Sequence, residues 1–214
     1  MAKGLQGFYY DSFLGQLLGS KEREKIVDSF ISRCENVNSF LDAGCAEGHY
    51  LSKFQEKFKE NVGLEFDEHR SLRASQNLSK KALVVRGSVE NLPFKDNSFD
   101  LVLCSEVLEH IPDWKKALSE LQRVSRKYIV LTIPLEKAFF WRFFSIIAPP
   151  ITRGHLHRLG SLDIKHNLNG KFKLIGSEKV YLPFFNSMFS QNTSEKYGIY
   201  SCFLLEKSES SKKK

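Results

Sequence analysis

Five short apolar runs mark the first two thirds of the chain, and a glycine, an acid or a proline stands at or next to the end of each. They cover residues 39–44, 61–66, 82–87, 98–106 and 127–134. The apolar positions in each run are largely consecutive and do not alternate with polar ones, which is typical of parallel strands covered on both faces. We therefore predict five buried, parallel strands in this part of the chain.

Amphipathic stretches precede or separate these runs and predict helices. They cover residues 20–33, 48–59, 67–79 and 112–125. In the first stretch Val27 and Phe30 fall on one face, and Ser20 is in position to cap the helix. Strands that alternate with helices at this spacing indicate an α/β fold.

The last third of the chain changes pattern. Residues 161–169 predict a short helix, whereas 171–185 and 197–207 alternate like an antiparallel pair. Together with the five earlier runs, this predicts a doubly wound, mostly parallel, seven-stranded sheet with an antiparallel C-terminal strand. Neither a linker nor a repeat divides the chain, so we predict one domain over residues 1–214.

An aromatic segment, residues 135–160, separates the two patterns and is predicted to be a lid or insertion. Its phenylalanines recur at helical spacing over 139–150, which is also typical of ordinary core. The alternatives to core are a hydrophobic lid, a dimer face and an interfacial membrane anchor. The stretch is too short to span a bilayer and contains Arg142, so a membrane-spanning helix is excluded. We favour an apolar or lipid-like substrate, with peripheral membrane contact through 139–150.

Composition and charge narrow the class of protein only slightly. Apolar residues make up 42% and charged residues 27% of the chain, as in an ordinary globular domain. The net charge of +7 includes three lysines in residues 208–214, a predicted disordered basic tail, and the remaining excess does not require nucleic acid. Four cysteines without a CxxC motif, and an N-terminus without the apolar core of a signal peptide, predict a reduced, cytoplasmic protein.

The turn after the first predicted strand, "LDAGCAEG" at 41–48, combines an acid with two glycines. Ligands of open α/β sheets bind at the carboxyl ends of strands, where this turn lies. Its glycine spacing differs from the GxGxxG of a pyrophosphate site, and Asp42 would repel a phosphate but attract a cation. Glu65 ends the second run and is in position to accept hydrogen bonds from ribose hydroxyls. These residues predict a nucleoside ligand with a positively charged, amino-acid-like tail.

Three segments in this order, "LDAGCAEG", "VGLEFDE" and "VVRGSVENLPFKDNSFDLVLCSEVLEHIPD", resemble the class I S-adenosylmethionine-dependent methyltransferases. The pattern is most similar to the type 11 branch that includes the ubiquinone and menaquinone C-methyltransferases. The resemblance covers residues 38 to about 134, and 83–113 is its most specific part. It implies a Rossmann-like sheet, methyltransferase activity and S-adenosyl-L-methionine as cofactor, with S-adenosyl-L-homocysteine as product.

The resemblance also implies roles for individual residues. Asp42 would face the methionine amino group, Glu65 the ribose hydroxyls and Phe66 the adenine ring. The backbone around the methionine and ribose would come from Gly44, Cys45, Ala46 and Gly48. Ser88 and Val89 would meet the adenine edge, and Ser105 would lie under the methionine portion.

Two positions depart from the family pattern. Ala46 replaces a glycine, which a single methyl group is expected to allow. Ser88 stands where the family usually has an aspartate for the adenine amino group. Because a neutral hydroxyl is a weaker acceptor than a carboxylate, a lower cofactor affinity is expected.

Three histidines fall on the predicted substrate side. His110 follows the fourth predicted strand. Its role could be packing or helix capping as well as catalysis, so no catalytic residue is assigned. His155 and His157 have ligand-like spacing, but the sequence offers no evident third and fourth ligand, so we predict no metal site and favour a role at the substrate mouth.

The function predicted is methyl transfer to a small-molecule or lipid-linked acceptor, at oxygen or carbon. An RNA methyltransferase is the first alternative, although no separate RNA-binding module is visible. A catalytically silent, S-adenosylmethionine-binding protein is the second alternative, which the Ser88 departure leaves open. The glycine spacing disfavours a nicotinamide oxidoreductase.

Overall fold

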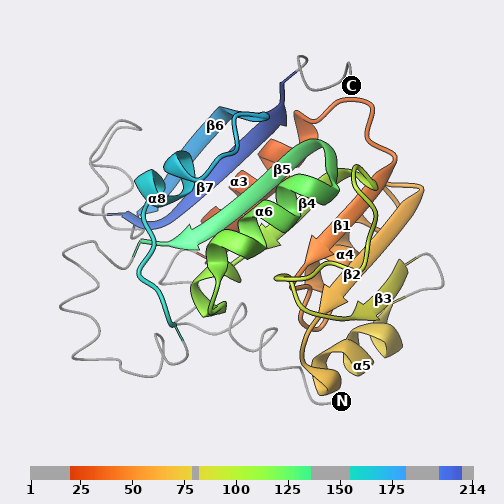
Figure 1. Ribbon diagram of the computed structural model, residues 1–214. Coiled ribbons are helices and arrows are strands. Elements are labelled where there is room, and N and C mark those ends of the chain that lie inside the picture. The colour runs from red at the N-terminus through yellow and green to blue at the C-terminus, as the bar shows by residue number, and fades with distance from the viewer. Residues whose placement is uncertain (1–19, 79–81, 136–154, 182–197, 209–214) are drawn as a thin grey trace.

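A computed structural model of the 214-residue chain describes residues 20–78, 82–135, 155–181 and 198–208. Its centre is a seven-stranded sheet in the order β3-β2-β1-β4-β5-β7-β6 (Figure 1). The strands are β1 (Ser39–Ala43), β2 (Glu60–Glu65), β3 (Ala82–Arg86), β4 (Phe99–Ser105), β5 (Ser125–Pro134), β6 (Phe172–Tyr181) and β7 (Gly198–Lys207). β1 to β5 pair in parallel, whereas β7 runs antiparallel to both β5 and β6.

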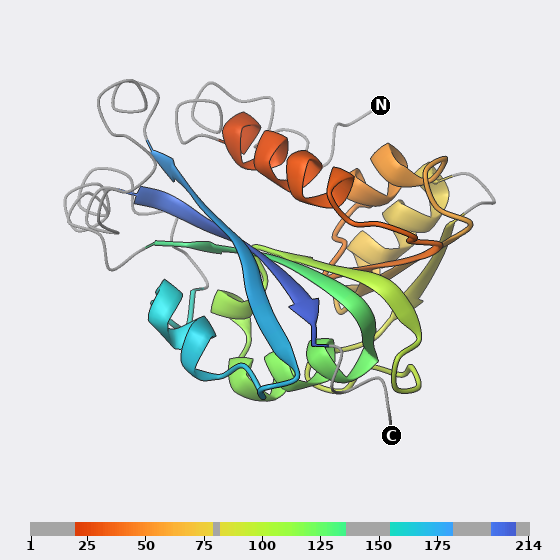
Figure 2. The ribbon, with the colours of Figure 1, turned by 90° about the horizontal axis from the view of Figure 1, so that it is seen from above.

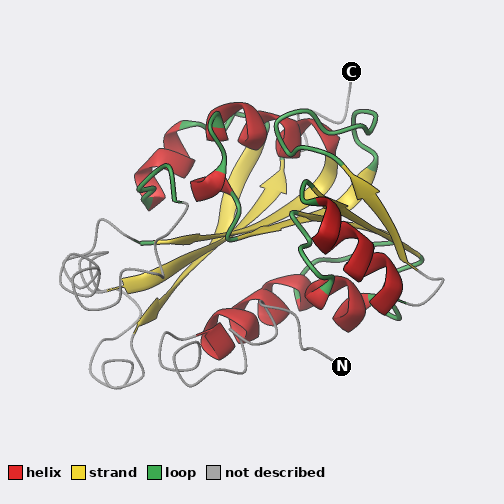
Figure 3. Ribbon diagram, turned by 90° about the horizontal axis from the view of Figure 1, so that it is seen from below, coloured by secondary structure: helices red, strands yellow, loops and turns green. Residues whose placement is uncertain are grey.

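Helices cover both faces of the sheet. Figures 2 and 3 show α3, α4 and α5 on one face and α6 and α8 on the other. The bounds are α3 (Ser20–Ser32), α4 (His49–Phe54), α5 (Glu68–Asn77), the 3-10 turn η1 (Leu108–His110), α6 (Trp114–Val124) and α8 (Ser161–His166). Both faces of the central strands β1 and β4 are therefore buried, as the continuous apolar runs predict. The prediction of burial is wrong for β3, which ends the described sheet and contains no buried residue.

Alternate side chains of the strands enter two separate apolar cores. In β5, Ile129 and Leu131 join the core beneath α6, whereas Val130 joins the core beneath α3. Phe40 of β1 packs in the α3 core and Leu41 in the α6 core, and neither side chain is exposed. This two-sided burial fixes the register, because a slip by one residue would exchange the two sets of side chains.

The predicted α/β fold class is confirmed, including the antiparallel C-terminal strand. The helix predicted at 161–169 is the shorter α8, and the strand predicted at 171–185 is described only as far as Tyr181. The proposed lid at 135–160 is described only at Leu135 and over 155–160, and the stretch 139–150 and the tail from 209 onward lie outside the described residues. Within the described part of the chain, no helix is long and apolar enough to cross a membrane.

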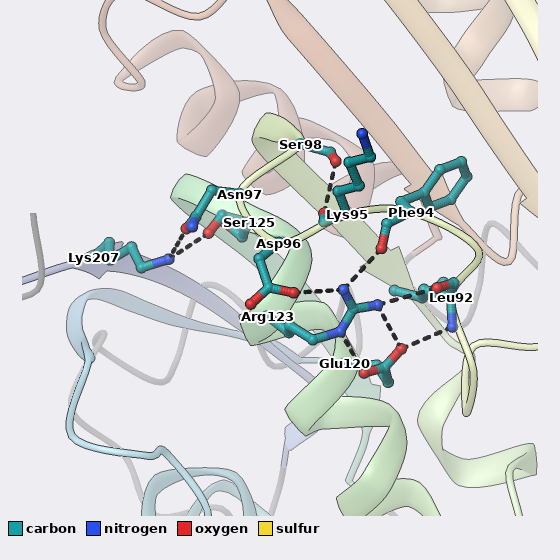
Figure 4. Close-up of polar contacts among 10 residues, drawn as sticks. All are labelled: Leu92, Phe94, Lys95, Asp96, Asn97, Ser98, Glu120, Arg123, Ser125 and Lys207. Atoms are coloured by element: carbon teal, nitrogen blue, oxygen red, sulfur yellow. Dashed lines mark hydrogen bonds and ion pairs between the residues drawn. The ribbon is translucent and has the colours of Figure 1, made fainter. Parts of the chain in front are cut away.

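A polar network ties the loop after β3 to helix α6 (Figure 4). The guanidinium of Arg123 donates to both carboxylate oxygens of Glu120, at 2.6 and 2.8 Å. It also donates to the carbonyl oxygens of Leu92 at 3.1 Å and Phe94 at 2.8 Å, and to the carboxylate of Asp96 at 2.8 Å. The "NLPFKD" part of the sequence motif thus has a structural role. Its carbonyl oxygens bind Arg123, which holds in place the loop that follows the predicted adenine end.

Candidate functional site

A cavity of about 630 Å³ opens at the carboxyl ends of β1, β2, β3 and β4. Its wall is built from four chain segments that each follow one of these strands. The segments contribute Gly44 and Ala46, then Leu64 to Asp67 with Arg70, then Gly87 to Glu90, then Glu106, Val107 and His110 to Pro112. The position agrees with the rule that open α/β sheets bind ligands at strand ends.

The glycine loop after β1 turns in a left-handed backbone conformation. The φ angles are +87° at Gly44, +47° at Ala46 and +85° at Gly48. A Cβ atom built on Gly44 would lie 2.4 Å from a methyl carbon of Val107, so glycine is required there for space as well as for conformation. Ala46 adopts the same kind of conformation with a side chain, which explains why the family prefers glycine at this position.

Glu65, at the end of β2, holds this loop in place. Its Oε2 accepts the backbone N–H of Ala46 at 2.8 Å, and its Oε1 accepts the N–H of Asp67 at 2.9 Å. The side chain lines the cavity although the residue is only 8% exposed. Each carboxylate oxygen keeps a second lone pair, so the acceptor capacity expected for ribose hydroxyls is present.

Asp42 lies in the middle of the sheet, between Gly63 of β2 and Leu103 of β4. The residue is 2% exposed, and its Oδ2 has no hydrogen-bond partner among the described residues. Burial, reinforced by the nearby Glu65 carboxylate, raises the pKa of Asp42 to about 8. A buried carboxyl without a partner is costly and favours a cationic ligand group, which would restore its charge.

Cys45 contributes through packing and not through its thiol. Its side chain is buried, and burial raises the pKa of the thiol, so a thiolate is disfavoured. A Cβ atom on Gly63 would lie 2.7 Å from the Cys45 sulfur and 2.4 Å from Leu51. Gly63 is therefore needed for the loop to pack against β2. A glycine inside an apolar strand indicates such a close approach, so the sequence does contain a signal for this residue.

The predicted adenine end contains both apolar and polar groups. Phe66 is 74% exposed on the cavity wall, beside the 4%-exposed Val89. The Ser88 hydroxyl accepts the backbone N–H of Glu90 at 3.2 Å and lies 3.5 Å from the Glu90 carboxylate. Glu90, to which the sequence assigned no role, brings a carboxylate to the wall where the family's aspartate is missing.

Ser105 belongs to a polar cluster at the end of β4. Its hydroxyl lies 2.9 Å from that of Thr132, which donates to Glu106 Oε1 at 2.9 Å. Glu106 has a left-handed φ of +57° and forms an ion pair with the buried Arg23 at 3.4 Å. Glu106 stands at the predicted end of the fourth strand, but its pairing with Arg23 was missed because the two lie 83 positions apart in the sequence (106 minus 23) and only the fold brings them together.

The three predicted substrate-side histidines have different surroundings. His110 lines the cavity, and its ring centroid lies 4.6 Å from that of His155. His157 instead contacts the carbonyl oxygen of Pro112 through Nε2, at 3.0 Å. The buried Glu109 joins His110 and His155, and one ligand atom from each of the three lies within 4.8 Å of the others. The sequence paired His155 with His157, whereas the fold pairs it with His110.

Most of the predicted site residues therefore line the cavity, whereas the others do not. Those on the wall are Gly44, Ala46, Glu65, Phe66, Ser88, Val89 and His110. Those outside the wall are Asp42, Cys45, Gly48, Ser105, His155 and His157. Asp42 and Ser105 lie in β1 and β4 near the carboxyl ends of these strands, and Cys45 lies in the turn after β1.

Comparisons with known proteins agree with this geometry. Residues 41–131 match a family model described as a methyltransferase domain. An uncharacterized protein of Methanocaldococcus jannaschii is 30% identical over 163 residues, which is 72% of this chain and 64% of that protein. A demethylmenaquinone methyltransferase of Lactiplantibacillus plantarum is 30% identical over 134 residues, 55% of this chain and 56% of its own. The chain spans 64%, 40% and 51% of the lengths of three curated relatives.

Solved structures share the fold at low sequence identity. The magnesium protoporphyrin IX methyltransferase of Synechocystis, solved with bound SAH, has a TM-score of 0.68 and 15% identity, covering 94% of this chain and 91% of its own. A methyltransferase solved with the Trm112 activator of Haloferax volcanii has a TM-score of 0.66 and 13% identity, covering 93% and 96%. The fold is therefore that of the class I S-adenosylmethionine-dependent methyltransferases, and residues 41–131 belong to the methyltransferase-domain family, as the sequence motifs predict.

Proposed function

We propose that this chain transfers a methyl group from S-adenosylmethionine to a small-molecule or lipid-linked acceptor, at oxygen or carbon. The observation that carries the proposal is the buried Asp42 oxygen without a partner, beneath a cavity at the strand ends. A cationic amino-acid tail is the ligand group that would compensate this carboxyl. A phosphate-bearing dinucleotide would not, because it would bring two more negative charges toward Asp42 and Glu65.

The residues around the cavity fit the rest of the cofactor. The Gly44 turn allows close approach of the backbone, and Glu65 keeps lone pairs for the ribose hydroxyls. The exposed Phe66 ring offers a stacking face for adenine, and the Ser88 hydroxyl keeps acceptor capacity for its amino group. The sulfonium of the bound cofactor supplies the electrophilic methyl group, so the protein's main contribution is to position the acceptor and exclude water.

The acceptor would enter past Val107 and His110, opposite the adenine end of the cavity wall. The named relatives support a small organic acceptor, since one is a demethylmenaquinone methyltransferase and one structural neighbour a magnesium protoporphyrin IX methyltransferase. Contact of the 139–150 segment with a membrane or an apolar acceptor remains part of this proposal. A variant lacking residues 139–150 that kept full substrate and vesicle binding would contradict that part.

Thermal unfolding with S-adenosylmethionine, S-adenosylhomocysteine and NADH in parallel tests the cofactor. A ligand at about one hundred times its Kd adds about 2.7 kcal/mol, which raises the Tm of a chain of this size by roughly 5–10 °C. We expect a rise with both adenosyl ligands and none with NADH. Equal Tm values with all three ligands would contradict the cofactor site. A rise with the adenosyl ligands, but no methyl transfer to quinols or phenols, would favour the silent binding protein.

A further inference from the structure

We propose that Glu109, His110 and His155 form a divalent-metal site at the acceptor side of the cavity. Their nearest ligand atoms lie within 4.8 Å of one another, one carboxylate oxygen and two imidazole nitrogens. On a common zinc-type ion such atoms would lie about 3.3 Å apart, given metal–ligand distances near 2.0–2.2 Å. Small rotations of the two histidine side chains would therefore complete the site.

The ligand set matches a transition-metal ion more closely than Mg²⁺ or Ca²⁺. Two imidazoles and one carboxylate suit Zn²⁺, Mn²⁺, Co²⁺ or Fe²⁺, whereas Mg²⁺ and Ca²⁺ prefer oxygen ligands throughout. The three ligands also differ in exposure, since Glu109 is buried, His155 is half-buried and His110 is exposed. An ion held here would be bound by the buried Glu109 carboxylate and by the exposed His110, which lines the cavity.

The backbone holds His155 beside the other two residues. The N–H groups of Leu156 and His157 both donate to the carbonyl oxygen of Glu109, at 2.8 and 3.2 Å. The His157 side chain adds a contact with Pro112, so the segment is attached both to η1 and to the chain that follows it. The residue that supplies the carboxylate thus also anchors the segment that supplies the second imidazole, and such outer contacts fix the orientation of metal ligands.

Three protein ligands leave coordination positions open, and one of the three, His110, lines the cavity. This arrangement is typical of catalytic metal sites, where water or substrate takes the remaining position. Resting on the proposed methyl transfer, we infer that the acceptor is an oxygen compound whose hydroxyl binds the ion, which lowers the pKa of that hydroxyl. The acceptor oxygen gives its proton to solvent and forms the new bond to the methyl carbon, and the sulfonium sulfur keeps the electron pair of the bond that breaks.

The metal site can be tested without any turnover. The full chain is treated with EDTA, freed of chelator and titrated with Co²⁺, with visible absorption and calorimetry as readouts. We expect one ion per chain with d–d bands typical of nitrogen and oxygen ligands, and an affinity at least tenfold weaker in His155→Ala. His166→Ala is the matched control, because His166 is an exposed histidine at the end of α8 that does not belong to the cluster, and its Co²⁺ affinity should equal that of the wild type.

The same protein samples separate failure of this inference from failure of the proposed function. S-adenosylhomocysteine binding is measured for each variant and should be unchanged in His155→Ala, since His155 is not on the cavity wall. Equal Co²⁺ affinity in wild type and His155→Ala, or no stoichiometric binding to the wild type, would overturn the metal site. Loss of S-adenosylhomocysteine binding in the wild type, with Co²⁺ binding intact, would instead overturn the proposed function.

Discussion

Asp42 and Glu65 end neighbouring parallel strands, and the charge of Glu65 helps to keep the Asp42 carboxyl protonated. Burial is the larger cause and Glu65 the second, and together they raise the pKa of Asp42 to about 8. The two acids have different partners in the protein. Glu65 accepts two backbone N–H groups, whereas Asp42 Oδ2 has no hydrogen-bond partner within the described residues. We therefore expect the Asp42 carboxyl to lose its proton when a cationic ligand group binds beside it.

The first prediction concerns the pH dependence of cofactor binding. Because the pKa of Asp42 is near 8, a bound ammonium group should expel its proton at neutral pH, and affinity should rise with pH by up to about tenfold per unit. The useful window is pH 6 to 7.5, since the ligand's own amino group loses charge above about pH 8. Calorimetry with S-adenosylhomocysteine measures the slope, and Asp42→Asn should flatten it. A Kd independent of pH in the wild type would contradict this assignment.

The Asp42 carboxyl also makes the stability of the unliganded protein depend on pH. Its folded-state pKa, about 8, exceeds the ordinary value of 3.8, so its contribution to stability is fully present below about pH 4. That contribution is lost as the pH rises toward 8. In urea unfolding, Asp42→Asn should therefore gain stability relative to the wild type as the pH increases from 5 to 8. Parallel pH profiles for the two proteins would show that Asp42 is not the group responsible.

The second prediction concerns Gly44. In Gly44→Ala the new methyl group meets Val107 at a backbone φ of +87°, so we expect a loss of about 2–4 kcal/mol and of cofactor binding. Gly170→Ala is the matched control, with a φ of +72° but nothing within 4 Å of the added carbon. It should lose only about 1–2 kcal/mol from strain and keep its cofactor affinity. Urea unfolding and calorimetry together distinguish the two, and equal behaviour would count against the close approach at Gly44.

The third prediction concerns Phe66. Phe66→Ala should weaken S-adenosylhomocysteine binding by roughly tenfold or more, because stacking of an aromatic ring on a base contributes about 1–3 kcal/mol. Stability should change little, since the residue is 74% exposed. Leu83→Ala removes another exposed apolar side chain that is not on the cavity wall and should leave affinity unchanged. If both variants bind like the wild type, adenine does not stack on Phe66.

The fourth prediction concerns Arg123, which joins α6 to the loop after β3. Arg123→Met removes hydrogen bonds to Glu120, Leu92 and Phe94, so unfolding by urea should show a loss of about 2–3 kcal/mol. Arg73→Met breaks only the exposed ion pair with Glu47 and should cost less than about 1 kcal/mol. A similar small cost for both variants would mean that the loop does not depend on the guanidinium.

The sheet and most of the cavity wall could be predicted because their signals are local. Continuous apolar runs such as 39–44 indicate buried strands, and the acid at the end of a run marks a strand end, as Glu65 does. The remaining site residues depend on contacts between distant segments. Arg23 reaches Glu106 only because α3 packs over the sheet, and His155 meets His110 only because its segment binds the carbonyl of Glu109. No spacing in the sequence encodes such contacts between distant segments.

The place of β7 between β5 and β6 has a consequence for synthesis. β6 is made before β7, and within the described sheet its pairing partner is β7. A nascent chain that ends near residue 181 would therefore expose β6 without a neighbour and β5 with one open edge. Unpaired strand edges are prone to join other chains, so this protein should depend on chaperones until β7 leaves the ribosome. Translation speed over residues 182–207 would then influence the yield of folded protein.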